Sequence, residues 1–528
     1  MTNQAPDVHE LMQRLASAMP ADRIAQGDIV TTFATDVYRR RELPVAVVRP
    51  QSVEELRAAV ATITSADFAV FTRGGGASYT DGYLPSTPRS ALLDMGGLDR
   101  IVEINQEDCY VTVEAGVTWA ALKTALDALG LRTPFFGPFS GLAATVGGSV
   151  SQHSISHGSA RYGTSAESVL AMDVVLASGE LIRTGAAARG SAPFCRWYGP
   201  DLAGLFVGDC GTLGVKARIT LPLLRRYDEF RCLSFGFAKL DDMAKALRAA
   251  GLERLEDEHF AIDAALSRGQ IARQERTSKL TLIRNLWATA PSTGAAISQL
   301  LRTAWAGTRQ MRNCEYSVHF IIDGCSGQDV SARSRRLQEL MESAGGWSMV
   351  NTVPAVVRGM PFAPLINTLG PNGERWVPVH GHLPYSRVAD FHRDLTAYFA
   401  QHATEMKQLG VWHGGMFMSV GSTAFLYEIA LYWPGEQTAY HRKVVPAEYL
   451  ASLPSYRDEA AVNEFVEKLK RGLIDLYSRH GATHFQLGKS YPYGSVLDKA
   501  ALNLIRALKS AVDPKHLMNP GALDLPDA

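Results

Sequence analysis

Two glycine-rich stretches contain the residues best suited to bind an anionic ligand. The first reads Arg-Gly-Gly-Gly-Ala-Ser at residues 73–78, and the second reads Ala-Thr-Val-Gly-Gly-Ser at residues 144–149. Because glycine has no Cβ, such a backbone can adopt positive φ and bring successive N–H groups close to a diphosphate. Two such stretches, each expected between strands, suggest a long dinucleotide. Neither fits G-x-G-x-x-G or the Walker pattern, which disfavours a nicotinamide Rossmann domain and a P-loop.

Length, charge and cysteine content restrict the class of protein. A chain of 528 residues exceeds the usual size of one hydrophobic core, so we expect two domains. Lys plus Arg and Asp plus Glu both number 53, and this balance gives no support for a nucleic-acid partner. The six cysteines have no C-x-x-C spacing, which fits a reducing compartment and disfavours a disulfide scaffold or a zinc knuckle.

The sequence contains no targeting or membrane-spanning pattern. Its first twenty residues lack a basic segment followed by an apolar one, and no stretch of about 18 apolar residues occurs. We therefore expect a cytoplasmic protein with no integral membrane segment, while peripheral association with a membrane stays open.

The elements that must position the glycine stretches are short strands and amphipathic helices. A capping box at residues 52–55 predicts a helix with Leu56, Val60 and Ile63 on one face. Strands are expected at residues 45–48, 68–72, 91–95, 101–104, 110–114, 169–176 and 180–183, and a helix at 118–129. The spacing of these strands predicts an α+β fold. Beyond residue 225, longer helices alternate with aromatic strands such as 425–433, and 495–511 form a final amphipathic helix.

Several short motifs, in order along the chain, resemble the FAD-linked oxidoreductases of the vanillyl-alcohol oxidase and p-cresol methylhydroxylase (PCMH) superfamily. They lie at residues 73–76, 145–149, 161–163, 174–180 and 208–215, and the tail at 513–521 is also similar. The resemblance implies a two-subdomain, PCMH-type FAD-binding domain over residues 1–225, with 495–528 returning to it. It also implies an α+β cap (substrate) domain over residues 226–494, and a homodimer is a family expectation.

The resemblance assigns FAD contacts to both glycine stretches, to a loop along the pyrimidine side of the flavin and to the tail. The residues are Arg73, Gly74, Gly75, Gly76, Ala77, Ser78, Thr145, Val146, Gly147, Gly148, Ser149, His153, Arg161, Tyr162, Gly163, Gly208, Gly211, Thr212, Gly214, Val215 and Asn519. Many relatives carry a histidine in the first stretch that bonds covalently to the flavin, where this chain has Ala77. Others attach the flavin from the cap, where the nearest residue is Arg375, which cannot form the link. We therefore predict non-covalent FAD.

Two branches of the superfamily compete for the substrate. The 2-hydroxyacid branch, which acts on D-lactate or glycolate, typically carries His-x-Gly-Asp-Gly-Asn-x-His, whereas residues 413–417 read His-Gly-Gly-Met-Phe. The missing carboxylates disfavour a site built around a divalent cation, and we predict no metal. The aromatic-alcohol branch is similar over residues 371–384, and ring side chains of the cap can sandwich an aromatic substrate. We favour oxidation of a phenolic benzylic or allylic alcohol, of the kind lignin breakdown yields, by hydride transfer to flavin N5. A 2-hydroxyacid dehydrogenase and a flavin electron-transfer subunit are the alternatives.

Six cap residues are candidates for catalysis: His380, His382, Tyr491, Tyr493, Lys489 and Arg375. His380 and His382 alternate along an expected strand, so both point to one face and suit a base, a metal pair or two structural histidines. The other four would stabilise a phenolate, because the ordinary phenol pKa of about 10 must be lowered. Packing within the cap is the alternative for the two tyrosines. The sequence leaves the electron acceptor open among oxygen, a quinone and a cytochrome.

Overall fold

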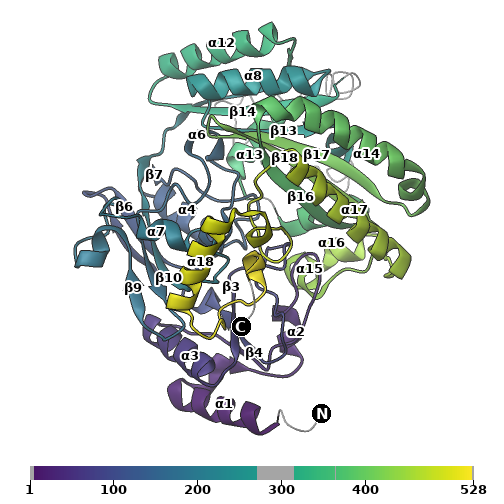
Figure 1. Ribbon diagram of the computed structural model, residues 1–528. Coiled ribbons are helices and arrows are strands. Elements are labelled where there is room, and N and C mark those ends of the chain that lie inside the picture. The colour runs from purple at the N-terminus through teal and green to yellow at the C-terminus, as the bar shows by residue number, and fades with distance from the viewer. Residues whose placement is uncertain (1–4, 270–313, 363, 526–528) are drawn as a thin grey trace.

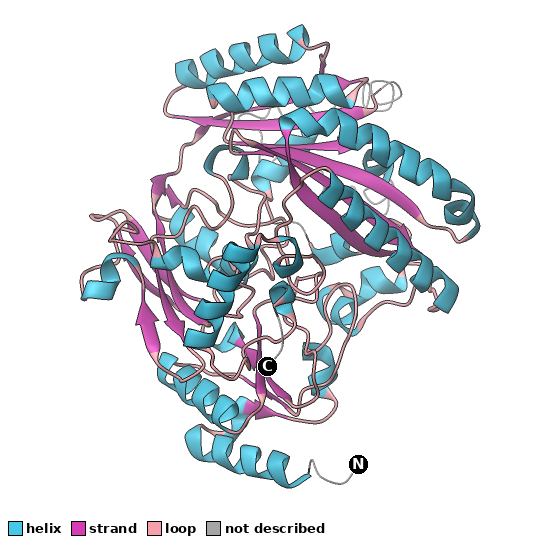
Figure 2. Ribbon diagram, viewed as in Figure 1, coloured by secondary structure: helices cyan, strands magenta, loops and turns pink. Residues whose placement is uncertain are grey.

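The computed structural model describes residues 5–269, 314–362 and 364–525. Figure 1 shows an N-terminal region in purple and blue below, and a cap in teal and green above it. The yellow C-terminal helix α18 (Lys499–Val512) lies against the N-terminal region. Figure 2 shows that both regions combine helices with sheets, as the sequence predicts.

The first sheet leads directly into the first glycine stretch. Its strands lie in the order β1-β2-β4-β3, with β2, β4 and β3 parallel. The strand β3 ends at Arg73, so the glycines begin where the strand stops. The elements of this part are α1 (Ala5–Ala18), β1 (Ile24–Ala25), α2 (Ile29–Phe33), β2 (Ala46–Val48), α3 (Val53–Ser65), β3 (Ala69–Arg73) and β4 (Ser90–Asp94).

Helix α3 shows how the local sequence sets these elements. Ser52 is its N-cap, and the Ser52 side chain accepts a hydrogen bond from the Glu55 N–H at 3.1 Å. In a complete capping box, the Glu55 carboxylate would accept from the backbone N–H of Ser52. Here it accepts from the backbone N–H of Gln51, one residue earlier, so the predicted box is only half formed. The inner face of the helix is fully buried in the N-terminal core through Leu56, Val60 and Ile63.

A second, antiparallel sheet completes the N-terminal region. Its strands lie in the order β5-β6-β10-β8-β9, and a short pair, β11-β7, lies beside it. The elements are β5 (Ile101–Asn105), β6 (Tyr110–Glu114), α4 (Trp119–Asp127), β7 (Leu131–Arg132), α5 (Val146–Gln152), α6 (Ser159–Tyr162), β8 (Ala171–Val175), β9 (Leu181–Arg183), α7 (Leu202–Phe206), β10 (Val215–Pro222) and β11 (Leu224–Arg225).

The second glycine stretch lies in a helix, so the expectation of a strand on either side of it is wrong. Thr145 is the N-cap of α5, and its hydroxyl accepts from the Gly148 N–H at 3.2 Å. Gly147 lets this helix approach the end of β6, because a Cβ added there would lie 2.6 Å from the Ala115 Cβ. At least one glycine of this stretch therefore serves helix packing.

The cap is a seven-stranded sheet with helices on one face. Its strands lie in the order β15-β12-β14-β13-β17-β18-β16, and Figures 1 and 2 show α8, α12, α14 and α17 above it, with the other face toward the N-terminal region. The strands are β12 (Glu229–Phe237), β13 (Glu258–Asp263), β14 (Tyr316–Gly324), β15 (Trp347–Met349), β16 (Arg375–Pro384), β17 (Trp412–Val420) and β18 (Ala424–Trp433). The helices are α8 (Leu240–Glu253), α12 (Gly327–Ser343), α13 (Thr352–Gly359), α14 (Val388–Gln408), α15 (Ala439–Val444), α16 (Ala447–Ala451) and α17 (Ala460–Arg479).

The end of the chain is bound to the N-terminal region by a buried lysine. The Lys509 ammonium donates to the carbonyl oxygens of Thr212 at 2.7 Å and Met518 at 2.9 Å, and to the Asp513 carboxylate at 2.6 Å. The residues after α18 also pair with β3, where Val70 donates to the Leu517 carbonyl oxygen. The segment thus contacts the N-terminal region, while the division into domains at residue 225, with residues 495–528 returning to the first, stays a prediction.

Replacing Lys509 with methionine should therefore destabilise the fold. The Asp513 carboxylate, which is 1% exposed, would lose its cation, and breaking a buried pair from one side costs about 3–5 kcal/mol. Urea denaturation measures this change. Lys515→Met is the matched control, because Lys515 pairs with Asp67 at the surface and should change the free energy of unfolding by less than about 1 kcal/mol. Equal effects of the two substitutions would contradict this role of Lys509.

Candidate active site

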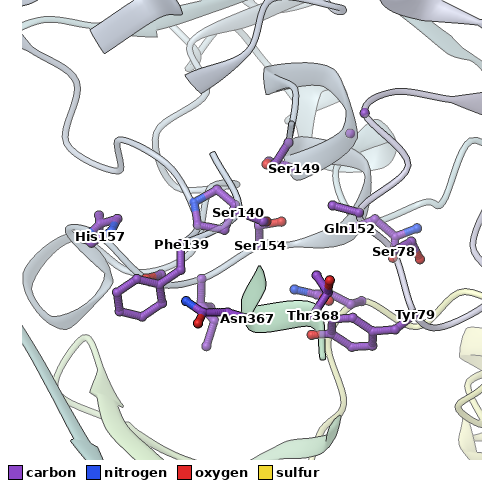
Figure 3. Close-up of a pocket in the computed structure, with 18 of the residues that line it drawn as sticks. Ser78, Tyr79, Phe139, Ser140, Ser149, Gln152, Ser154, His157, Asn367 and Thr368 are labelled. Carbon is purple, nitrogen blue, oxygen red and sulfur yellow. The ribbon is translucent and has the colours of Figure 1, made fainter. Parts of the chain in front are cut away.

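A cavity of about 760 Å³ lies between the N-terminal region and the cap. Its floor consists of the glycine stretches and the loops near residues 138–140, 154–157 and 210–216, and its roof is the inner face of the cap sheet. Figure 3 shows Ser78 and Tyr79 at one end of the cavity and Phe139 and His157 at the other.

The first glycine stretch presents unused backbone donors to the cavity. Residues 74–78 line it, and within the described part of the chain none of their N–H groups donates a hydrogen bond. The backbone here is packed so closely that a Cβ on Gly75 would lie 1.7 Å from the Ala143 carbonyl oxygen. Gly76 adopts positive φ, at 75°. A row of free N–H groups on bare backbone suits an anionic group such as a diphosphate.

The second stretch forms cavity wall but offers fewer donors. The Gly147 N–H donates to the Ala115 carbonyl oxygen at 2.9 Å, and the Gly148 N–H donates to Thr145. The Ser149 hydroxyl accepts from the Trp119 indole at 2.8 Å. The sequence suggests that both stretches hold the diphosphate through N–H groups, whereas among the described residues both glycines of the second stretch have their N–H groups in hydrogen bonds and only its Thr145 N–H has no acceptor.

A buried ion pair fixes the loop that begins at Gly208. The Asp209 carboxylate accepts from the N–H groups of Gly211 at 2.9 Å and Leu213 at 3.3 Å, and it pairs with the Lys216 ammonium. Gly211 has a φ of 76° and lines the cavity, and a Cβ added there would approach no atom closer than 4.0 Å. Lys216 is the one Lys or Arg among the described residues that line the cavity, and its charge is balanced by Asp209.

The FAD candidates divide into those that line the cavity and those that lie behind its wall. The lining residues are Gly74, Gly75, Gly76, Ala77, Ser78, Thr145, Gly147, Gly148, Ser149, Gly211, Gly214 and Val215. The candidates outside the lining are Arg73, Val146, His153, Arg161, Tyr162, Gly163, Gly208, Thr212 and Asn519.

Several of the residues behind the wall have visible structural roles. Arg161 pairs with Asp257 of the cap at 3.0 Å. The Asn519 side chain donates to the Gly82 carbonyl oxygen at 2.8 Å and so joins the tail to the loop after the first stretch. The His153 ring occupies the space where a side chain on Gly208 would lie, because a Cβ there would come within 1.8 Å of it. Contacts of these residues with FAD stay a prediction.

His380 and His382 share one face of β16, but Phe485 separates them from the cavity. The Phe485 ring lines the cavity and stacks on both imidazoles, with centroid distances of 4.0 Å and 4.6 Å. Burial lowers the pKa of His380 well below its ordinary value and that of His382 to about 4. Both rings are therefore neutral near pH 7. The Tyr491 hydroxyl lies next to them and accepts a hydrogen bond from the backbone N–H of His380 at 3.1 Å.

The remaining candidates for catalysis also lie outside the cavity lining. The Lys489 ammonium donates to the Asn519 side chain at 2.7 Å, and burial lowers the pKa of Lys489 to about 7. Arg375 donates to the Tyr38 carbonyl oxygen at the far end of β16. Tyr493 is half-buried and contacts the apolar cluster near the tail. Among the described residues no group of three or more His, Cys, Asp or Glu is arranged to hold a metal.

Sequence reasoning missed Glu428, an acidic residue on the cavity roof. Glu428 lies on β18, opposite His380 on one neighbouring strand and Met416 on the other. Burial raises the pKa of Glu428 to about 7. The signal in the sequence is a single charged residue within the otherwise apolar strand Ala424–Trp433. Such a carboxylate is suited to proton transfer near neutral pH.

Tyr79 is a second residue that sequence reasoning passed over. It follows the first glycine stretch directly and lines the cavity. Its ring makes edge contacts with Trp376 at 5.4 Å and with His380 at 5.8 Å. Tyr79 therefore connects the first glycine stretch to the part of the roof that carries His380 and Glu428.

Family models match two parts of the chain. Residues 44–185 match the FAD binding domain, and residues 489–523 match the C-terminal domain of FAD linked oxidases. The chain therefore contains the FAD binding domain and the C-terminal domain of FAD linked oxidases. The resemblance stated from the sequence is confirmed, and FAD is the cofactor of this domain.

Curated relatives match only part of the chain. Glycolate oxidase subunit GlcD of Bacillus subtilis is 27% identical over 242 residues, which is 46% of this chain and 50% of that protein. A mitochondrial D-lactate dehydrogenase (cytochrome) of Arabidopsis thaliana is 33% identical over 186 residues, which is 35% of this chain and 31% of that protein. The chain thus spans half the length of these relatives or less.

Solved structures match the whole fold. p-Cresol methylhydroxylase with substrate bound has a TM-score of 0.72 at 17% identity, covering 98% of this chain and 97% of that one. 4-Ethylphenol oxidase from Gulosibacter chungangensis, in an isoeugenol complex, has a TM-score of 0.68 at 17% identity, covering 99% and 98%. The predicted α+β fold of an FAD-binding domain with a cap is confirmed by these matches.

The residues present fit FAD. The free N–H groups of residues 74–78 suit its diphosphate, and the Gly211 backbone is open toward the cavity. Non-covalent binding stays a prediction. Among the histidines of the lining, His157 lies nearest the second glycine stretch in the sequence. Both of its ring nitrogens are in hydrogen bonds, one with the Glu258 carboxylate at 2.6 Å and one with the Pro361 carbonyl oxygen at 2.7 Å.

Gly75→Ala should weaken FAD binding. The new Cβ cannot fit against the Ala143 carbonyl oxygen, so the row of donors must shift, and we expect at least a tenfold loss of affinity, about 1.4 kcal/mol. Equilibrium titration of the deflavinated protein measures it. Gly251→Ala on α8 is the control, because its Cβ would meet no atom closer than 3.5 Å. Wild-type affinity in a folded Gly75→Ala variant would exclude the first stretch as the diphosphate site.

Proposed function

We propose that this chain oxidises the hydroxyl group of a neutral, ring-bearing alcohol such as a benzylic or allylic alcohol. The observation that carries the proposal is Glu428, a carboxylate with a pKa of about 7 that faces the cavity among aromatic side chains. The curated relatives act on hydroxyacids but match only part of the chain, and the similar solved structures of phenol-oxidising enzymes share only its fold. We therefore infer the substrate from the residues that line the cavity.

The cavity that Glu428 faces also carries ring side chains. Tyr79 and Trp376 contact each other edge to face, and Tyr432 and Phe485 also line the cavity. A largely apolar pocket with aromatic walls and one polar group binds a ring and orients its substituent. This lining supports an aromatic or otherwise unsaturated substrate.

The charges on the lining favour a neutral alcohol over a 2-hydroxyacid. A substrate carboxylate needs a cation or several donors, but Lys216 is already paired with Asp209. The lining also carries Glu258, whose carboxylate pairs with His157. Glu428 itself would repel an anion placed beside it. These groups, within the described part of the chain, leave no free positive charge for a hydroxyacid.

A phenolate mechanism has less support than the sequence suggests. Lys489 and Arg375 lie outside the lining, and their side chains donate to Asn519 and Tyr38. We therefore propose that Glu428 removes the proton of the alcohol directly, with no need for a phenol on the ring.

In this mechanism the hydroxyl proton passes to the Glu428 carboxylate as the carbinol carbon becomes a carbonyl. FAD, when bound, supplies the acceptor for the hydride that leaves that carbon. Because the ring of Phe485 separates His380 and His382 from the cavity, Glu428 is the titrating group that the proposed mechanism uses at this position.

We also propose a cytoplasmic enzyme that passes electrons to oxygen, a quinone or a cytochrome and that can form a homodimer. No helix in the described ranges has the length and apolar character needed to cross a bilayer.

Glu428→Gln should lower kcat/KM for a benzylic alcohol by about 10²- to 10⁴-fold, because loss of a general base typically has that effect. The base works as the carboxylate and is protonated below its pKa. The wild-type kcat/KM should thus rise with pH through about 7 and level off above it, and this limb should vanish in the variant. Stopped-flow reduction of the bound flavin at several pH values measures both.

Glu436→Gln is the matched control for this test. Glu436 lies just beyond β18, is 59% exposed and pairs with Arg442 at the surface. It should keep the wild-type rate and pH profile. A Glu428→Gln variant with full FAD occupancy and an unchanged pH profile would exclude Glu428 as the base.

The substrate class is tested by anaerobic mixing of the purified FAD-loaded protein with benzyl alcohol, cinnamyl alcohol, D-lactate and glycolate. We expect the two alcohols with rings to bleach the flavin absorbance and the two hydroxyacids to leave it oxidised. Reduction by a hydroxyacid alone would favour the hydroxyacid alternative. Reduction by none of these compounds would favour an electron-transfer subunit. Acid precipitation of the same sample should release the flavin into solution, as non-covalent binding requires.

A further inference from the structure

We propose that the substrate carries a second, neutral apolar group, and that this group lies against α13 at the end of the cavity opposite Tyr79. The proposal rests on the proposed function for the alcohol end of the molecule. For the second group it rests on the shape, the apolar lining and the charge balance of the α13 end.

The cavity extends well beyond the surroundings of Glu428. Its roof residues run from Trp376 on β16 across β18, β17 and β13 to Ser317 on β14. Neighbouring strands lie about 4.8 Å apart, so the roof is about 19 Å long and β14 lies about 14 Å from the strand of Glu428. A single ring beside Glu428 does not reach the β14 end of this roof.

Helix α13 forms the end wall. Its residues Ala355 and Val357 pack with Ile321 of β14, and Val353, Val356 and Val357 line the cavity. Val353 is 39% exposed although it lies in a cavity wall. Apolar side chains left accessible within a pocket mark a place where a ligand removes apolar surface from water.

Aromatic rings complete this end of the cavity. Phe139 on the floor contacts Phe260 on the roof, with ring centroids 5.8 Å apart, and both line the cavity. Figure 3 shows Phe139 and His157 at the end opposite Ser78 and Tyr79. The free N–H groups of the first stretch directly precede Tyr79, so the diphosphate site lies at the other end from α13.

The polar groups near α13 carry no unbalanced charge. The His157 imidazole lies between the Glu258 carboxylate and the Pro361 carbonyl oxygen. His319 bonds to Ser234 at 2.9 Å and to Ser317 at 3.2 Å, and burial lowers the pKa of His319 to about 3. The imidazole of His319 is therefore neutral. An alkyl chain or a second ring fits these surroundings, and an ionised group does not.

The test measures binding of unreactive ligands to the FAD-loaded protein. Benzamide and its 4-methyl, 4-ethyl and 4-butyl derivatives keep the ring, carry no charge and contain no oxidisable alcohol. By isothermal titration calorimetry we expect the wild-type Kd to fall about fourfold for each added methylene, which is the transfer free energy of a buried CH₂ group.

Val356→Trp should remove this dependence on chain length, because the larger side chain fills the α13 end. Val353→Trp is a second variant at a more exposed position of the same helix, for use if the first does not fold. Leu504→Trp on α18 is the control, since Leu504 is 72% exposed and lies outside the cavity lining, and it should keep the wild-type dependence.

The outcomes separate this proposal from the proposed function. A Kd that is flat across the series in the wild type, or that falls equally in the wild type and the α13 variants, would overturn the α13 site. A dependence that the α13 variants abolish supports the site even if no ring-bearing alcohol reduces the flavin, in which case only the proposed reaction fails.

Discussion

The active-site cavity depends on three ion pairs that fix the cap over the N-terminal region. His157 pairs with Glu258 at 2.6 Å, and two further pairs, Arg161–Asp257 at 3.0 Å and Arg132–Asp323 at 3.4 Å, join the same two regions. All three carboxylates belong to the segment just before β13, to β13 itself or to β14. Because breaking a buried pair costs several kcal/mol, these contacts help to hold the roof over the floor at the β13–β14 end.

This arrangement assigns different chemistry to the two regions. The floor supplies neutral backbone donors at residues 74–78, which attract an anionic group without placing a side-chain charge in the cavity. The roof supplies one titrating carboxylate, Glu428, whose pKa is raised to about 7 because the same closure that forms the cavity removes it from water. The other charged groups of the lining are balanced within the protein, as Lys216 is by Asp209 and Glu258 is by His157. In the proposed function, cofactor binding and proton transfer thus use separate parts of one cavity.

Features set by nearby residues could be predicted from the sequence, and features set by distant contacts could not. The Ser52 cap and the shared face of His380 and His382 both follow from local patterns. Whether a glycine N–H is free depends on its tertiary partner, as Gly147 shows by donating to Ala115. The covering of His380 by Phe485 depends on a residue about a hundred positions later in the chain. Glu428 becomes conspicuous only once the fold shows that its strand faces the cavity and that its carboxylate is buried.

A crystal structure with FAD and the unreactive ligand benzamide tests the central claim most directly. The account predicts diphosphate oxygens within hydrogen-bonding distance of the N–H groups of residues 74–78, and the ligand amide beside Glu428 with its ring on the side toward α13. A diphosphate held at the second glycine stretch with residues 74–78 unused, or a ligand ring that does not approach Glu428, would contradict it.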